Sequence, residues 1–152
     1  MFRGITNLNI DTKGRLAIPS RYRDVITTEA SGHIVVTVDH TDRCLLVYPM
    51  NEWIDLEQKL MKLNNMHRRA RNVQRLILGH AHECDLDSQG RILVPAPLRE
   101  YAGLAKKAVL VGQMKKFELW DAEAWQKQTE AMIEEARSDD FDMDESLNQV
   151  SI

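Results

Sequence analysis

The sequence predicts a mainly β fold with peripheral helices, built from two copies of one unit. Residues 10–19 (IDTKGRLAIP) return as residues 86–95 (LDSQGRILVP), with aspartate, glycine, arginine and proline identical at matched places. Apolar residues alternate on both sides of the first copy, which is typical of β-strands. Arg23 and Arg99 keep the same spacing behind the two segments. Because each copy alone is small for independent stability, we expect the two to pack on each other or on other subunits.

The repeated segment predicts a hairpin, with a four-residue turn between two strands. Asp11 can accept hydrogen bonds from backbone N–H groups of the turn, and Gly14 tolerates positive φ at its last position. Arg15 then leaves the turn at the base of the second strand. The second copy has the same residue types at these places, namely Asp87, Gly90 and Arg91. Two interpretations stay open: an Asp–Arg pair that only holds the turn, and a hairpin end that presents guanidinium groups to a ligand. The repetition favours function, although duplication of a structural hairpin would also produce it.

Local signals predict the other elements of the first copy. These are a short helix from about residue 20, strands at 33–39 and 44–48, and helices from about 51 to 63 and from 66 to 78. Ser20 is a suitable N-cap for the first helix. Asn64 and Asn65 break the long apolar periodicity, and Gly79 stops the last helix.

The last of these helices carries a run of cations, Arg68, Arg69, Arg71 and Arg75, preceded by Lys59 and Lys62. No acidic residue lies between Glu57 and Glu83. Such a run is usually a solvated face or a subunit contact. Contact with DNA through this helix is the minority interpretation, because no helix-turn-helix pattern places it in a groove.

The second copy repeats the plan from residue 80 onward. Its predicted elements are strands before and after the turn, a short helix at 97–101, strands at 108–112 and 117–120, and a helix that Asp121 caps. Residues 47–53 match residues 119–125, so the duplication covers whole units. We therefore expect a first unit with added helices (1–78), a second unit (79–128) and an acidic C-terminal helix or tail (129–152).

Composition places the chain among intracellular globular proteins. Hydrophobic residues make up 43% of it and charged residues 28%, which is ordinary for a globular domain. No apolar run approaches the length of a membrane span, and residues 1–15 lack the apolar core of a signal peptide. Two cysteines, Cys44 and Cys84, are too few for a disulfide scaffold and fit a reducing cytoplasm.

The net charge of −3 is unevenly distributed along the chain. Residues 130–152 carry −7, which leaves +4 for residues 1–129. The acids of this segment are Glu130, Glu134, Glu135, Asp139, Asp140, Asp142, Asp144 and Glu145. A solvated tail or fraying helix end is the favoured interpretation, and modulation of polyanion binding elsewhere on the molecule is the alternative.

Metal binding and catalysis have little support in the sequence. His80, His82 and Cys84 alternate, so on a strand they would share one face and could begin a zinc site. No second Cys or His pair at typical spacing supports this site. We see no Gly-rich phosphate loop, nucleophile elbow or paired catalytic carboxylate. We therefore predict no cofactor, no bound metal and no enzymatic activity.

Several stretches together resemble one known family. They are Phe2-Arg3-Gly4, residues 45–49 (LLVYP) with Glu52-Trp53, residues 73–81 (VQRLILGHA), residues 117–120 (FELW), and the D-x-x-x-R motifs at 11–15 and 87–91. In this order and over nearly the whole chain, they resemble the MraZ family. The acidic tail adds little to the match.

The resemblance implies both a fold and a function. It implies two tandem double-split, swapped-hairpin β-barrel units similar to AbrB and SpoVT, in pseudo-twofold arrangement. It also implies a bacterial transcriptional regulator, expected to be a repressor. Such a regulator binds double-stranded DNA at short direct repeats upstream of the division and cell-wall gene cluster, which includes its own gene. Members assemble as rings of identical subunits in the cytoplasm and associate with the nucleoid, not with membranes.

Carried to this chain, the family motif falls on Asp11 and Arg15 and on Asp87 and Arg91, with Gly14 and Gly90 inside the turns. Arginine can read guanine O6 and N7 in the major groove, whereas Lys13 and Arg3 suit phosphates better. The expected DNA-binding residues are Arg3, Lys13, Arg15 and Arg91. Because Gln89 stands where the first copy has Lys13, we expect the two units to contact DNA unequally. The alternative is an oligomeric structural or scaffold protein whose Asp–Arg pairs are only turn locks.

Overall fold

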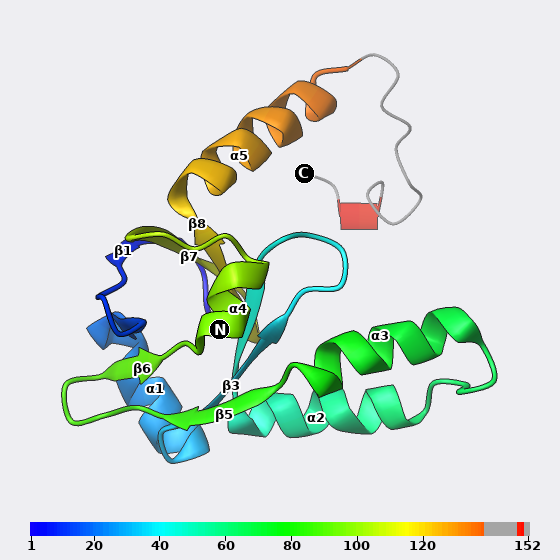
Figure 1. The fold of residues 1–152 in the computed structure, drawn as a ribbon, viewed down its shortest axis with the longest axis horizontal. Coiled ribbons are helices and arrows are strands. Elements are labelled where there is room, and N and C mark those ends of the chain that lie inside the picture. Colours follow the sequence, from blue (N-terminus) through cyan, green and yellow to red (C-terminus); the bar gives the residue numbers. More distant parts are fainter. Residues whose placement is uncertain (139–148, 151–152) are drawn as a thin grey trace. The chain divides into compact units, whose positions relative to one another are not determined.

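The computed structural model describes residues 1–138 and 149–150. The chain divides into two compact units, Met1–Ala122 and Glu123–Ile152. The first of these two units, Met1–Ala122, contains the strands of both sequence copies and most of the helices (Figure 1). The second holds most of helix α5 (Ala122–Ala136). Part of the acidic segment expected at 129–152 lies in this helix, whereas residues 139–148 and 151–152 lie outside the described part of the chain.

The first unit is built on a six-stranded antiparallel sheet in the order β1-β7-β8-β4-β3-β5. Its strands are β1 (Ile5–Asn9), β3 (His33–Val38), β4 (Leu45–Pro49), β5 (His82–Asp85), β7 (Lys107–Gln113) and β8 (Lys116–Asp121). Edge strand β1, from the first sequence copy, pairs with β7 of the second. Edge strand β5, from the second copy, pairs with β3 of the first. The two copies therefore share one sheet and pack on each other, as expected.

A separate two-stranded ribbon joins β2 (Arg15–Ala17) to β6 (Arg91–Leu93). The simple hairpin expected at each repeat is wrong in its pairing. The turn forms, with Asp11 N donating to Arg15 O at 2.9 Å, but β1 pairs with β7 while β2 pairs with β6. Pairing across the copies places Leu16 and Ile92 together in the core, each 1% exposed. This exchange is the swapped-hairpin arrangement that the family resemblance implies, and the expected fold class is confirmed.

The remaining helices of the first unit are α1 (Ser20–Ala30), α2 (Met50–Met61), α3 (Arg68–Gly79) and α4 (Ala96–Tyr101). Ser20 is the first residue of α1 and not its N-cap, which is Pro19 with φ −53° and ψ 138°. The proline ring already sets the φ value that this position needs. Helix α3 begins two residues later than expected, because Asn64 Oδ1 accepts a hydrogen bond from Met66 N and Asn64 O accepts one from His67 N.

The sheet is covered on both faces. Alternate residues Ile34, Val36 and Val38 of β3 pack with Leu16 and Ile92 of the ribbon. The intervening Val35 belongs to a second cluster with Trp53 of α2 and Ile77 of α3. Side chains of a strand alternate between its faces, so α2 and α3 cover the face opposite the ribbon. This is why residues 34–38 are all buried and, apart from Thr37, all apolar.

One polar side chain, Thr37, is fully buried within this apolar strand. Its Oγ1 donates a hydrogen bond to Ile77 O at 2.6 Å, which fixes the end of α3 on the sheet. A buried hydroxyl needs such a partner. Within the described ranges, no helix combines the length and apolarity required to cross a bilayer.

Candidate nucleic-acid interface

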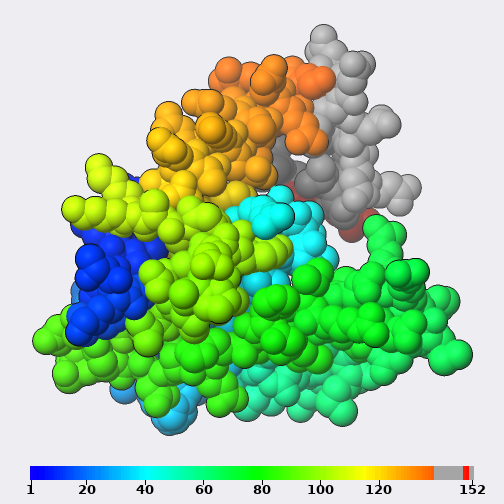
Figure 2. Space-filling view, viewed as in Figure 1, coloured from blue at the N-terminus to red at the C-terminus, as the bar shows by residue number. Residues whose placement is uncertain are grey.

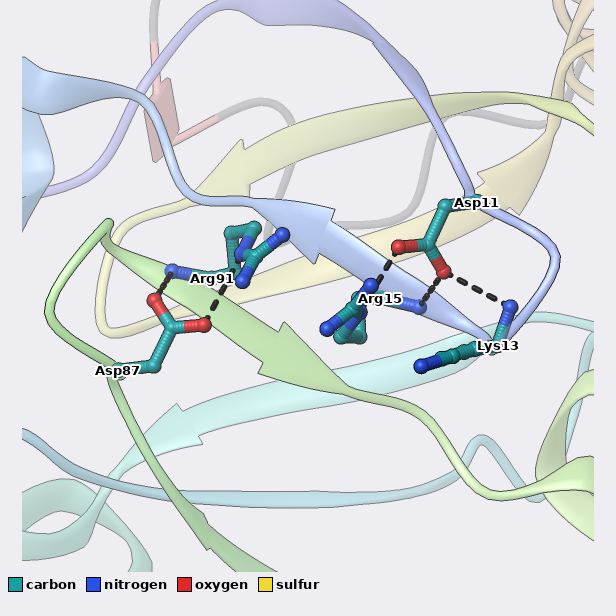
Figure 3. A network of polar contacts seen from close by, with 5 residues as sticks. All are labelled: Asp11, Lys13, Arg15, Asp87 and Arg91. Carbon is teal, nitrogen blue, oxygen red and sulfur yellow. Dashed lines mark hydrogen bonds and ion pairs between the residues drawn. The ribbon is translucent and has the colours of Figure 1, made fainter.

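The ribbon brings the two repeated arginines onto one surface. Arg15 pairs with Leu93, and Arg91 pairs with Ala17. The central residues of β2 and β6 face the core, so the four terminal residues face outward. Arg15 and Arg91 are therefore diagonal neighbours on the outer face, at about 7–8 Å by general strand geometry. One chain carries both copies of the motif side by side (Figure 3).

The same hydrogen bonds close both turns. At residues 11–15, which we call turn one, Asp11 Oδ1 accepts from Lys13 N and Arg15 N, each at 2.9 Å, and Oδ2 accepts from Arg15 Nε at 2.8 Å. At residues 87–91, turn two, Asp87 Oδ1 accepts from Gln89 N and Arg91 N, each at 2.8 Å, and Oδ2 accepts from Arg91 Nε at 3.0 Å. The Asp–Arg pair expected under the structural interpretation is therefore present in both copies.

These bonds stabilise the ionised carboxylates. The hydrogen bond from Arg15 N is the largest cause of the lowered pKa of Asp11, about 2; burial opposes it, and the Arg15 side chain, Lys13 N and the Arg15 charge lower the pKa further. The hydrogen bond from Arg91 N is the largest cause of the lowered pKa of Asp87. Both carboxylates are therefore charged at neutral pH, and each offsets the charge of the arginine that it holds.

Each arginine keeps one edge available. The Asp pair uses Nε alone, and neither Arg15 nor Arg91 forms a hydrogen bond through its Nη atoms to any residue within 1–138 or 149–150. Both side chains are about one-third exposed. A guanidinium held through Nε has its orientation fixed while its outer N–H groups can still donate.

Two further arginines, absent from the expected site, brace the turns. Arg99 Nε donates to Val94 O at 3.1 Å, and a Cβ added to Gly14 would lie 2.8 Å from the same Nε. Arg23 Nε donates to Ile18 O at 2.6 Å, and a Cβ on Gly90 would lie 2.2 Å from it. Each turn glycine thus packs beneath the arginine of the other copy. The equal spacing of Arg23 and Arg99 behind the repeat was the sequence signal for this role.

Backbone bonds complete the exchange. Val94 N donates to Gly14 O, and Ile18 N donates to Gly90 O, both at 2.9 Å. Gly14 and Gly90 have φ of 89° and 72°, the left-handed region that favours glycine. The glycines are therefore required both by the turn conformation and by the close approach of the other copy.

The other expected DNA-binding residues divide between two places. Lys13 is exposed within turn one, beside Arg15 (Figure 3). Arg3 precedes β1, whereas turn one follows it, so the length of this five-residue strand, at about 3.3 Å per residue, separates them. Arg3 O accepts a hydrogen bond from the Tyr22 hydroxyl. The structure therefore brings Lys13, Arg15 and Arg91 together and leaves Arg3 apart.

The cations of α3 do not join this surface, because α3 covers the sheet face opposite the ribbon. Arg68, Arg69, Arg71 and Arg75 are all exposed there. Figure 2 shows α3 and its connection to α2 as one broad part of the molecular surface. The solvated-face or subunit-contact interpretation is compatible with this position.

The zinc interpretation rested on three residues alternating along one strand, and this premise is wrong. Strand β5 begins at His82, so His80 lies outside it as the C-cap of α3, with its Nδ1 2.8 Å from Leu76 O. Burial raises the pKa of Cys84 to about 11, which keeps the thiol neutral. Across the described ranges, no three His, Cys, Asp or Glu side chains are grouped to hold a metal ion.

Comparisons with known proteins agree with the repeat. Residues 1–76 and 77–145 each match the family model described as "MraZ protein, putative antitoxin-like". A relative from Shewanella violacea, named transcriptional regulator MraZ, is 51% identical over 152 residues, and the alignment covers 100% of both chains. A relative of the same name from Thioalkalivibrio sulfidiphilus is 58% identical over 135 residues, which are 89% of each chain. Another, from Halorhodospira halophila, is 47% identical over 152 residues, which are 100% of each chain.

Proposed function

The chain is a transcriptional regulator that belongs to the MraZ family, and from this premise we propose that it binds double-stranded DNA sequence-specifically through the β2–β6 ribbon. Its targets are short direct repeats upstream of the division and cell-wall gene cluster, including its own gene, and it represses them. It acts in the cytoplasm, associated with the nucleoid, as a ring-like homo-oligomer without a cofactor.

The observation that carries this proposal is the outer face of the ribbon. Two arginines lie there side by side, each oriented through Nε by its own aspartate. The major groove admits a two-stranded ribbon, and arginine donates two hydrogen bonds to guanine O6 and N7. In this proposal Arg15 and Arg91 read bases, while Lys13 contacts a phosphate and positions the ribbon without reading sequence.

Assembly into an oligomer would compensate for the weak charge of a single ribbon. Because Asp11 and Asp87 offset the arginines that they hold, each ribbon supplies little electrostatic attraction to DNA. Several ribbons facing several repeats gain affinity through effective concentration. The exposed apolar side chains at the connection between α2 and α3, with Met61 80% and Met66 88% exposed, suit a subunit contact.

The scaffold alternative is favoured by one specific observation. The hydrogen bonds of each Asp–Arg pair explain the turn geometry without any ligand. Under this alternative, the chain assembles through its apolar surfaces, and its ribbon has no partner.

Fluorescence anisotropy at a stated salt concentration tests the proposal, with the purified protein and duplex DNA from upstream of its own gene. The parent protein should bind this duplex more tightly than an unrelated one, and Arg15→Ala should reduce the difference. Arg21→Ala is a matched control, because Arg21 is an exposed arginine whose Nη2 donates to Thr6 Oγ1 at 2.8 Å, outside the ribbon.

Light scattering at micromolar protomer concentration, combined with the anisotropy titration, separates the two alternatives. Multimers that bind no DNA would support the scaffold alternative, whereas a stable monomer would contradict both alternatives, since both require assembly. If Arg15→Ala binds the operator like the parent while remaining multimeric, the ribbon is not the reading surface. The exposed arginines of α3 would then be the next to test.

A further inference from the structure

A hollow of about 510 Å³ lies beside turn one. Thr12 of the turn, Arg99 of α4 and Lys106 of the segment that leads into β7 line it. Ile10 N donates to Lys106 O at 2.8 Å, so the backbone fixes this segment against the turn. The hollow thus lies at one end of the ribbon and combines side chains from both copies.

The donors in the hollow are available to a ligand. Arg99 uses Nε on Val94 O, and its Nη atoms form no hydrogen bond to any residue that the structure describes. Lys106 is exposed and forms no ion pair within those residues. Thr12 adds a hydroxyl. The one carboxylate in the lining, Asp11, is already held by the backbone and side chain of Arg15.

We propose that this hollow binds a phosphate of the DNA backbone, with Arg99 and Lys106 supplying the charge and Thr12 a hydroxyl donor. The inference rests on the proposed function, because the phosphate belongs to the duplex that the ribbon contacts. Guanidinium, ammonium and hydroxyl groups are the usual phosphate donors of DNA-binding proteins. A phosphate at the end of the ribbon would fix the position of turn one along the duplex.

The equivalent place beside turn two lacks the lysine. Leu86 N donates to Gly32 O at 2.9 Å, which is the counterpart of the Ile10 N to Lys106 O bond. Gly32 therefore stands where turn one has Lys106, and Gln89 stands where it has Lys13. Arg23 is the counterpart of Arg99. At the matched positions, turn one has two lysines that turn two does not have.

This difference gives the pseudo-twofold ribbon a direction. A reader with two equal ends suits a palindromic site, because protein symmetry is mirrored in the operator. A reader with one strongly cationic end binds the backbone more strongly at that end, while its base contacts decide which way it points on the site. Direct repeats, in which every copy points the same way, suit a reader whose two ends differ. The phosphate hollow therefore assigns turn one as the anchoring end.

Salt dependence of binding tests the hollow. Lys106→Gln should lower the slope of log affinity against log salt by about 0.9 for each engaged protomer, equally on operator and unrelated duplexes. Lys115→Gln is the matched control, since it removes the same charge from the turn between β7 and β8, at the far end of β7. This control should leave the slope unchanged.

A neutral methylphosphonate, substituted for one phosphate at a time along one repeat, identifies the phosphate that the hollow binds. At one end of the repeat, the substitution should weaken the parent and leave Lys106→Gln unaffected, as a double-mutant cycle requires for a direct pair. An unchanged slope for Lys106→Gln, loss confined to the operator, or an altered multimer mass would each overturn the inference and leave the proposed function intact. Failure of the parent to bind any duplex would overturn both.

Discussion

Turn one and turn two have the same hydrogen-bonded frame and different charges. Each holds an aspartate that accepts two backbone N–H groups and one arginine Nε. Around this frame, Lys13 and Lys106 of the first turn are matched by Gln89 and Gly32 of the second. The difference teaches that duplication retained what holds the turn, while the groups that can contact a polyanion diverged.

The largest difference is expected from alanine at the turn glycines. A Cβ at Gly14 would lie 2.7 Å from Val94 O, a backbone atom, whereas a Cβ at Gly90 meets the side chain of Arg23. Both substitutions also pay for positive φ. Gly14→Ala should lower the free energy of unfolding by about 2–4 kcal/mol. Gly90→Ala should lower it by about 1–2 kcal/mol, because a long side chain can move aside.

Urea unfolding at equal protomer concentration measures these two values. Gly103→Ala, at an exposed glycine with positive φ but no atom within 4 Å of an added Cβ, separates the backbone cost from the overlap. Equal losses for the two substitutions would contradict this expectation. They would show that the backbone beside Gly14 and the Arg23 side chain beside Gly90 yield equally to an added Cβ.

The next largest effect concerns the arginines on the ribbon. Arg15→Ala should cost about 1–3 kcal/mol of binding free energy per engaged site and relax sequence preference. Arg91→Ala should cost less, because turn two lacks the lysines that anchor its counterpart. Titrations on operator and unrelated duplexes measure both effects, and light scattering checks that the variants still assemble. Equal losses for the two variants would mean that both turns engage DNA alike.

Much of this comparison was predictable from the sequence, because the residues that form the turns are local in the chain. Asp11 and Gly14 specify a turn by their own hydrogen bonding and φ preference, and Asp87 and Gly90 repeat the specification. The strands around them were expected within one or two residues. Local chemistry of this kind does not depend on the partner strand.

Strand pairing was not predictable from the residues alone. The three-residue β2 carries no signal that distinguishes β1 from β6 as its partner, since either pairing would bury Leu16. The same holds for Arg23 and Arg99, whose spacing was visible but whose contacts with Gly90 and Gly14 depend on the exchange of strands. Arg3 is separated from the ribbon because it precedes β1, whereas turn one follows the end of this strand.

Acid titration offers a third comparison, with a smaller effect on stability. The folded pKa of Asp11, about 2, lies below the unfolded value of about 3.9. Its ionised form therefore contributes stability above the unfolded value, and the contribution is lost as pH falls through the folded value. Carboxyl carbon chemical shifts measure the pKa directly. Arg15→Ala should raise the pKa of Asp11 toward its ordinary value, whereas Arg91→Ala should raise only that of Asp87, whose pKa is lowered by Arg91.

The smallest expected effect comes from the one position of the turn where the copies differ in charge. Lys13→Gln makes turn one resemble turn two and should reduce the salt slope by about 0.9 per engaged protomer, with sequence preference kept, since a phosphate contact carries no base information. The reverse change, Gln89→Lys, should raise the slope by the same amount only if turn two also reaches the duplex. Both substitutions lie on exposed positions of a turn whose bonds involve the backbone N–H and not the side chain, so folding and multimer mass should be unchanged. A raised slope for Gln89→Lys would show that both turns contact the backbone and that only their charges differ. An unchanged slope would restrict DNA contact to turn one.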